Sequence, residues 1–457
     1  MSNTKAKEAF IHIRRRGATS FLYRSFVRIV AIVFAFLLAF AFLAAVTKMS
    51  FGTLWEYVVQ GSTAARTSKL AYWKDTMLLL LVALALTPAF KMRFWNIGAQ
   101  GQILVGALIT STLMHDGAKM GGTPVIILSF ILSIIVGGLW AAIPAMFKVK
   151  LNANETLFTL MMNYIAVKIV AASIDAWKGK ASALAPFSVG RLPAIANNKY
   201  ALMIFAVAIL VVVMYFYLKH TKHGYEISVV GESLNTARYA GMNTSWIVIR
   251  TVFFSGALCG LCGFFYIAGV DYVISTTTSG SYGFTAIIVS WAASFNPFGM
   301  LIISMIMTFL SKGTSNVVNY APNLNQYTAY ITVGILLFFL IGCEFFIQYK
   351  IVFNQKIQAK LDTFSEKTHK AMPWWFDFWK KVSDACDKAI SVCQNWISVK
   401  LQVVKDFFVS KLGKKKQEEA QVEEKQVQVV AETAGADAQV AEPVIAGNSK
   451  KEGKNND

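Results

Sequence analysis

Three short motifs hold most of the polar side chains in this chain that could recognise a solute or a partner. The first contains three carboxamides, Asn96, Gln100 and Gln102, and two glycines, Gly98 and Gly101. Carboxamides donate and accept hydrogen bonds without a full charge, which suits a neutral polar solute. The glycines permit a tight turn or the close approach of another helix. A polar turn with helix caps would explain the same residues, so both interpretations stay open at this point.

The second motif places polar side chains along one helix. Asn154 and Glu155 fit the cap and first turn of that helix, where a side-chain oxygen and a negative charge are favourable. Thr156, Thr159 and Asn163 follow at spacings of three and four residues and therefore share one face. Inside a helix bundle such a face meets other helices or water rather than lipid.

The third motif is a short capped segment between two apolar stretches. A helix cap at Ser233 or Asn235 and a stop at Gly241 predict a helix of one to two turns. This helix would carry Arg238 and Tyr239 as exposed side chains. A short, stiff surface helix of this kind is suited to docking another protein.

Apolar stretches must position these motifs. The chain has 457 residues, 55% of them apolar and 15% charged, with mean hydropathy +0.49, whereas soluble proteins are nearer 25% charged. Residues 1–347 hold 26 Lys and Arg and 10 Asp and Glu, against 18 and 15 in residues 348–457. This excludes a soluble enzyme with one core. Most of the net charge of +19 flanks apolar stretches, as in membrane proteins, so we expect no nucleic-acid partner.

The apolar stretches predict an all-α polytopic membrane protein with about ten transmembrane helices. We expect spans at residues 29–47, 76–90, 102–114, 124–147, 155–174, 200–218, 248–270, 284–295, 298–311 and 328–347. With an inside N-terminus, the segments 91–101, 148–154 and 219–247 would be cytoplasmic, and 47–75, 175–199 and 312–327 would lie outside. Several spans are shorter than the hydrocarbon core of about 30 Å, so they must extend, thin the bilayer or pack inside the protein.

The ends of the chain differ from this membrane region. We expect a cytoplasmic basic N-terminus at 1–25, a transmembrane domain at 26–347, a cytoplasmic amphipathic helix at 348–413 and a disordered tail at 414–457. The amphipathic helix would lie on the membrane surface or pair with a partner helix. The cysteines Cys259, Cys262 and Cys343 lie in apolar stretches without acidic or histidine company. They are interpreted as small packing residues, with no metal site and no cofactor.

Four segments resemble, in order, the motifs of one known family, the permeases in the simple-sugar and nucleoside branch of ATP-binding-cassette importers (the branched-chain amino acid and ribose-type permeases). Residues 93–102 resemble its FNIGAEGQ signature and 154–165 its NEVISTLMLNYI element. Residues 230–242 resemble the VGENPEAARYAGI loop that contacts the ATPase, and 283–299 the segment GFDGIAVALLG…NPLG. Gln100 stands where Glu is commoner in the family, and Thr285 where Asp is commoner.

The resemblance implies a permease subunit that forms the pathway for nucleosides or a related sugar-bearing solute, with simple sugars or riboflavin as alternatives. It implies pairing with a second permease subunit, a cytoplasmic ATP-binding-cassette ATPase, an extracytoplasmic substrate-binding lipoprotein or protein, and a place in the bacterial inner membrane with both termini cytoplasmic. The residues assigned to the translocation pathway are Asn96, Gln100, Gln102, Thr156, Thr159, Asn163 and Asn296. Those assigned to ATPase coupling are Gly231, Glu232, Ala237, Arg238, Tyr239, Ala240 and Gly241.

Two other classes of protein compete with this interpretation. An ion-coupled secondary transporter of a small polar solute would use buried acidic or histidine side chains along its spans, and the uncharged stretch 272–311 argues against it. A membrane-embedded enzyme would need a constellation of His, Asp and Glu that the spans lack. The sequence also has no G-x-x-x-x-G-K-[ST] motif for nucleotide phosphates. We therefore expect a transport subunit that is not itself an enzyme.

Overall fold

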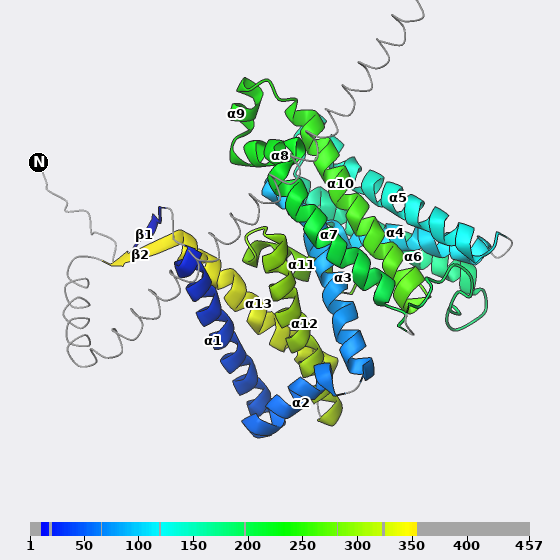
Figure 1. Cartoon of the computed structure of the whole chain (residues 1–457), viewed down its shortest axis with the longest axis horizontal. Coiled ribbons are helices and arrows are strands. Elements are labelled where there is room, and N and C mark those ends of the chain that lie inside the picture. The colour runs from blue at the N-terminus through cyan, green and yellow to red at the C-terminus, as the bar shows by residue number, and fades with distance from the viewer. Residues whose placement is uncertain are drawn as a thin grey trace, which may run out of the picture. The chain divides into compact units, whose positions relative to one another are not determined.

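The apolar stretches of the chain form long helices, which the computed structural model describes over residues 11–17, 21–64, 66–117, 120–195, 198–280, 282–321 and 325–353 (Figure 1). Residues 13–351 form one compact unit. The elements are β1 (Ile11–Arg15), α1 (Phe21–Thr47), α2 (Phe51–Thr63), α3 (Arg66–Lys91), α4 (Ala99–Asp116), α5 (Gly122–Leu151), α6 (Glu155–Lys178), α7 (Ala201–His220), α8 (Lys222–Glu232), α9 (Leu234–Tyr239), α10 (Thr244–Phe264) with a π-helical extension (Phe265–Asp271), α11 (Tyr282–Ala292), α12 (Pro297–Tyr320), α13 (Gln326–Gln348) and β2 (Tyr349–Phe353).

Each of the ten predicted spans coincides with a helix, which confirms the all-α polytopic class. Eight helices of the described chain are long and apolar enough to cross a membrane: α1, α3, α5, α6, α7, α10, α12 and α13. The remaining two predicted spans correspond to α4, with 18 residues, and α11, with 11 residues. A count of ten crossing helices therefore stays a prediction.

The bounds of two predicted outside segments are wrong, because the predicted spans stop at charged residues that lie inside helices. Residues 47–75 are largely helical, since they contain α2 and the first turns of α3. Residues 312–327 begin inside α12, which continues to Tyr320. Lys312 and Asp75 lie within α12 and α3 and pair with each other, so neither charge marks a helix end. The predicted spans 76–90 and 298–311 are accordingly too short, and 284–295 is too long because α11 ends at Ala292.

A small β-sheet departs from the all-helical expectation. Strand β1 pairs with β2 in a two-stranded sheet, and the amide of Arg16 donates to the carbonyl of Gln348 at 2.8 Å. The predicted amphipathic helix therefore does not begin at residue 348. The rest of that helix and the tail at 414–457 lie outside the described residues.

Helix α3 is the centre of the compact unit. Its residues 78–86 are all buried, because α7, α10, α11 and α12 all pack against it. Helix α1 shows the opposite pattern, with one apolar face exposed at Ile29, Val33 and Leu37. An apolar face of this kind is suited to contact with lipid.

The closest helix packing joins α10 to α5 and α4 at glycine positions. A Cβ atom on Gly260 would lie 2.1 Å from the carbonyl oxygen of Ser133 in α5, and one on Gly263 would lie 2.3 Å from that of Ile103 in α4. Cys259 and Cys262, each directly before one of these glycines, are fully buried. Small residues permit such backbone contacts, which contribute packing energy where lipid is as apolar as the protein.

We expect the substitution Gly260→Ala to destabilise the protein by roughly 1–3 kcal/mol, because the new methyl group overpacks the α5–α10 contact. Thermal unfolding of the detergent-solubilised protein measures the effect. Gly334→Ala in α13 is the matched control, since nothing lies within 4 Å of a Cβ at that position. An unfolding temperature of Gly260→Ala equal to that of the control would contradict this view of the packing.

Candidate functional site

The first motif lies in a non-helical connection, residues 92–98, that leads from α3 into α4. The chain turns at Arg93, whose backbone has the left-handed φ of +61°, and then passes Asn96, which is fully buried. The amide group of Asn96 donates to Gln102 Oε1 and to Ser255 Oγ, each at 3.3 Å. Its Oδ1 accepts from Gly98 N at 3.1 Å and from Gln102 Nε2 at 2.9 Å. Asn96 thus ties the connection to α4 and α10.

The polar face of α6 contacts the same connection. Oδ1 of Asn163 accepts from Gly101 N at 2.8 Å, and its Nδ2 donates to the carbonyl of Ile97 at 2.9 Å. Oγ1 of Thr159 accepts from Ile97 N at 3.2 Å. A Cβ on Gly101 would lie 3.0 Å from the Cα of Asn163, so glycine is what lets α4 begin this close to α6. Within one subunit, the side chains of Asn163 and Thr159 therefore form hydrogen bonds with backbone groups of the connection and of α4.

The other residues assigned to the pathway are more accessible. Gln100 is half-buried at the start of α4, next to α11, where a Cβ on Gly283 would lie 3.2 Å from its own Cβ. Thr156 is half-buried in the first turn of α6. Asn296 is exposed and caps α12 by accepting from Phe298 N at 3.1 Å. The structure therefore brings Asn96, Gln102, Thr159 and Asn163 together and leaves Asn296 apart.

The third motif forms α8 and α9, as predicted. Gly231 lies against the end of α3, where a Cβ would be 2.2 Å from the carbonyl oxygen of Lys91. Ser233 caps α9 by accepting from Thr236 N at 3.2 Å, and Gly241 ends the segment with φ of +75°. Of the residues assigned to coupling, Gly231 and Ala237 are buried, and the exposed ones are Glu232, Arg238, Tyr239, Ala240 and Gly241. Tyr239 is 93% exposed.

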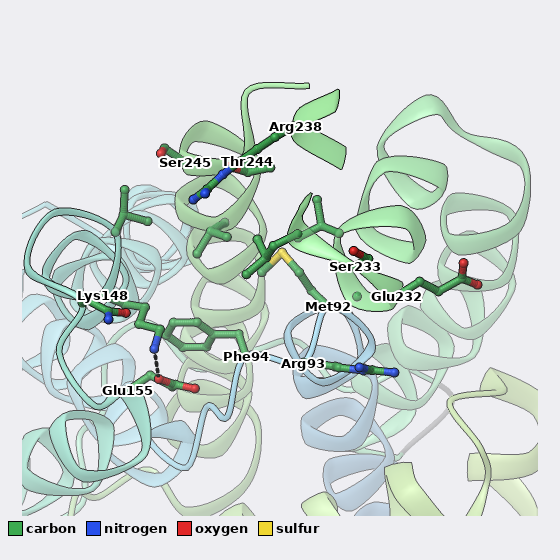
Figure 2. Close-up of a pocket in the computed structure, with 16 residues that line it drawn as sticks. Met92, Arg93, Phe94, Lys148, Glu155, Glu232, Ser233, Arg238, Thr244 and Ser245 are labelled. Carbon is green, nitrogen blue, oxygen red and sulfur yellow. Dashed lines mark hydrogen bonds and ion pairs between the residues drawn. The ribbon is translucent and has the colours of Figure 1, made fainter. Parts of the chain in front are cut away.

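A pocket of about 460 Å³ lies beside this segment. It is lined by the connection 92–94, the end of α5, the start of α6, residues 230–234 and Arg238, and the start of α10. Lys148 of α5 and Glu155 of α6 form an ion pair of 2.8 Å at its wall. Figure 2 shows Arg238 beside Thr244 and Ser245 at the rim, and Glu232 directed away from them. The third motif, the end of α3 and the α5–α6 connection thus meet at one end of the helix bundle.

A cluster that sequence reasoning missed joins α8 to α7 and α10. Nε2 of His223 faces two donors, Arg250 Nε at 3.0 Å and the Thr251 hydroxyl at 3.1 Å, so its proton belongs on Nδ1, beside the hydroxyl of Tyr217. Arg250 also pairs with Glu226 of α8. Burial, and then the guanidinium of Arg250, hold the pKa of His223 below its usual value. The contacts between α8 and α10 span 24 to 28 residues, so no local spacing could have revealed them.

The fold and these motifs together define the chain as a helical membrane protein of the transport class. The chain belongs to the family described as the branched-chain amino acid transport system permease component, whose model matches residues 70–341. The resemblance seen in the sequence is thereby confirmed, and the chain is a permease subunit of the kind found in ATP-binding-cassette importers.

Named relatives differ in their solutes. A glucose ABC transporter permease protein of Haloferax volcanii is 27% identical over 60% of this chain and 76% of its own length. A nucleoside ABC transporter permease protein of Lactococcus lactis is 26% identical over 75% of this chain and 96% of its own length. A probable riboflavin import permease protein of Treponema pallidum is 23% identical over 46% of this chain and 57% of its own length. No solved structure matches the chain.

We expect Asn163→Ala to destabilise the protein by about 1–3 kcal/mol for each buried backbone group left unpaired, here Gly101 N and the carbonyl of Ile97. Thermal unfolding in detergent measures this loss. Tyr164→Ala, next to it on the same helix but 63% exposed, is the control. Equal unfolding temperatures for the two variants would argue that the connection does not depend on α6.

We expect the stability of the protein to fall as the pH drops below about 6.5, the ordinary pKa of histidine. The lowered pKa keeps His223 neutral in the folded state, so unfolding takes up a proton and becomes easier in acid. Unfolding temperatures measured from pH 8 to pH 5 test this. His223→Gln, which cannot titrate, should show a weaker dependence on pH. An unchanged dependence would assign the acid sensitivity to other groups.

Proposed function

We propose that this chain is the permease subunit of an ATP-driven importer for nucleosides or a related sugar-bearing solute, and that its α8–α9 segment docks a separate ATPase. The observation that carries the docking assignment is Tyr239. It is 93% exposed on a capped helix of six residues, whereas α8 beneath it is fixed by Gly231 against α3 and by His223 and Glu226 against α10. A rigid support that carries a strongly exposed aromatic side chain is suited to transmit force from a docked partner.

The contacts of α8 suggest how docking is coupled to transport. A push on α9 reaches the carbonyl of Lys91 through Gly231, and α3 continues from there into the hydrogen-bonded connection 92–98. The same push reaches α10 through the Arg250–Glu226 pair. We infer that closure of the ATPases rocks α3 and α10 and thereby opens the solute route alternately to each side of the membrane.

The proposed route includes the residues assigned to it from the sequence, with Gln100 as the accessible carboxamide beside α11. A neutral donor and acceptor at this place suits hydroxyl-bearing, uncharged solutes. The nucleoside permease of Lactococcus lactis is similar over 75% of this chain, which supports a nucleoside as the solute, and the glucose permease, similar over 60%, supports a sugar as the alternative.

The proposal also includes the assembly and its orientation. Two permease subunits, identical or paralogous, pair in the bacterial inner membrane, two ATPases bind the α9 helices, and a substrate-binding protein or lipoprotein docks at the opposite end of the bundle. Both termini are then cytoplasmic, and the basic residues Lys91, Arg93 and Lys148 near the α8–α9 end agree with cytoplasmic connections.

We expect the double substitution Arg238→Ala with Tyr239→Ala to lower ATP-driven uptake at least tenfold in proteoliposomes that contain the ATPase and the binding protein. Its unfolding temperature should not change, because both side chains are exposed. Tyr330→Ala in α13, also an exposed tyrosine, is the control and should transport normally. Uptake at the wild-type rate by the double variant would rule out docking through α9.

A secondary transporter is the second candidate, and the buried carboxylate of Asp75 in α3 is the observation in its favour. The two mechanisms differ in their energy source. In cells, the importer loses uptake when ATP is depleted, whereas a secondary transporter loses it when an uncoupler collapses the ion gradient at constant ATP. Loss only with the uncoupler would overturn the proposal.

A further inference from the structure

A partly buried charge cluster joins three helices away from the α8–α9 end. The carboxylate of Asp75 in α3 is 5% exposed. It contacts Lys312 of α12 at 2.5 Å and its neighbour Lys74 at 3.0 Å, and the side chain of Tyr282 in α11 lies close enough to interact with it electrostatically. A fourth group, the hydroxyl of Tyr266, is buried without a hydrogen-bond partner, and its ring centroid lies 6.1 Å from that of Tyr282.

Stability alone does not account for this cluster. Asp75 and Lys312 both lie inside helices apolar enough to cross a membrane, where the desolvation of two charges offsets most of their attraction. A pair of apolar side chains would hold α3 and α12 together at least as well. A buried ion pair differs from an apolar contact in one useful respect, because water can replace its partners once the helices separate.

The position of the cluster connects it to the proposed route. Tyr282 is the first residue of α11, and the next residue, Gly283, packs on Gln100. The other end of α3 supports Gly231 of α8. Helix α12 begins just after Ser294 and Phe295, both with left-handed φ, of +49° and +60°. Motion of α3 at the α8–α9 end would therefore change its contact with α12 at Asp75.

We propose that Asp75 is a positioning residue for transport, whose pair with Lys312 holds α3 and α12 together in the closed state and breaks when the route opens. The proposal rests on the transport function proposed above. Separation leaves the carboxylate and the ammonium to water or to solute hydroxyls, so the cluster borders the route. The hydroxyl of Tyr266 gains a partner in the same step.

The first test is the double substitution Asp75→Asn with Lys312→Met, which removes both charges at once. In proteoliposomes with the ATPase and the binding protein, we expect ATP hydrolysis without solute to rise at least threefold and solute imported per ATP to fall. Lys312→Arg keeps the pair and should keep wild-type coupling. The matched control is Arg28→Gln with Glu344→Gln, which removes another ion pair between spans, of 2.6 Å, joining α1 to α13.

The proposal would be overturned if the variant without the Asp75 and Lys312 charges hydrolysed ATP and imported solute as the wild type does. It would also be overturned if the Arg28 and Glu344 control showed the same rise in hydrolysis and the same loss of coupling. A purely structural role would lower the unfolding temperature without raising hydrolysis in the absence of solute. If the wild-type assembly shows no solute-stimulated ATP hydrolysis, it is the proposed function that fails.

A second test leaves the ion pair intact, so it does not depend on the stability of the variant that lacks the Asp75 and Lys312 charges. The hydroxyl of Tyr72 in α3 donates to the carbonyl of Met305 in α12 at 3.0 Å. We expect a short bifunctional thiol reagent to link Tyr72→Cys to Met305→Cys and to reduce uptake at least tenfold, reversibly on reduction. The two single-cysteine variants, treated alike, should keep their uptake. Unchanged uptake by the linked protein would show that α3 and α12 need not separate.

Discussion

The buried, non-helical connection between α3 and α4 imposes the central constraint on this structure, because backbone groups shielded from water must find partners within the protein. Asn96 supplies partners from within the connection, and Asn163 and Thr159 supply them from α6. The carboxamides therefore serve the backbone before they serve any solute. Gln100 makes none of these bonds, which leaves it as the carboxamide of this motif best placed to meet a solute.

The same constraint explains why the ends of the helices are joined so firmly. An irregular segment transmits motion only if both its ends are held, and here α3 is held at Lys91 by Gly231 while α4 is held by α6. The neutral imidazole of His223 fixes α8 to α10 in a similar way. A displacement at α9 can thus reach the interior without being lost in a flexible loop.

The sequence predicted those features that depend on local pattern. Hydropathy located a helix at every predicted span, and the cap at Ser233 with the glycine at Gly241 located α9. Features that depend on pairing between distant residues are not predictable from one sequence. The sequence alone places Lys312 and Asp75 in loops, because it does not reveal that the two residues form an ion pair. Similarly, the shared face of Thr159 and Asn163 was recognised, but not that its partner is a backbone segment some sixty residues away.

The electrical balance of the interior bears on the kind of solute. Gln100 and Thr285 occupy places where carboxylates are commoner in the family, and the buried carboxylate of Asp75 is paired with Lys312 and Lys74. An amino acid would have to shed the water around its ammonium and carboxylate in such an environment, at a cost of several kcal/mol for each ion. A nucleoside or sugar carries no such charge, and its hydroxyls match the carboxamide of Gln100. The region thus offers a solute no unpaired carboxylate at these positions, which favours an uncharged polar solute, although the family takes its description from amino acid transport.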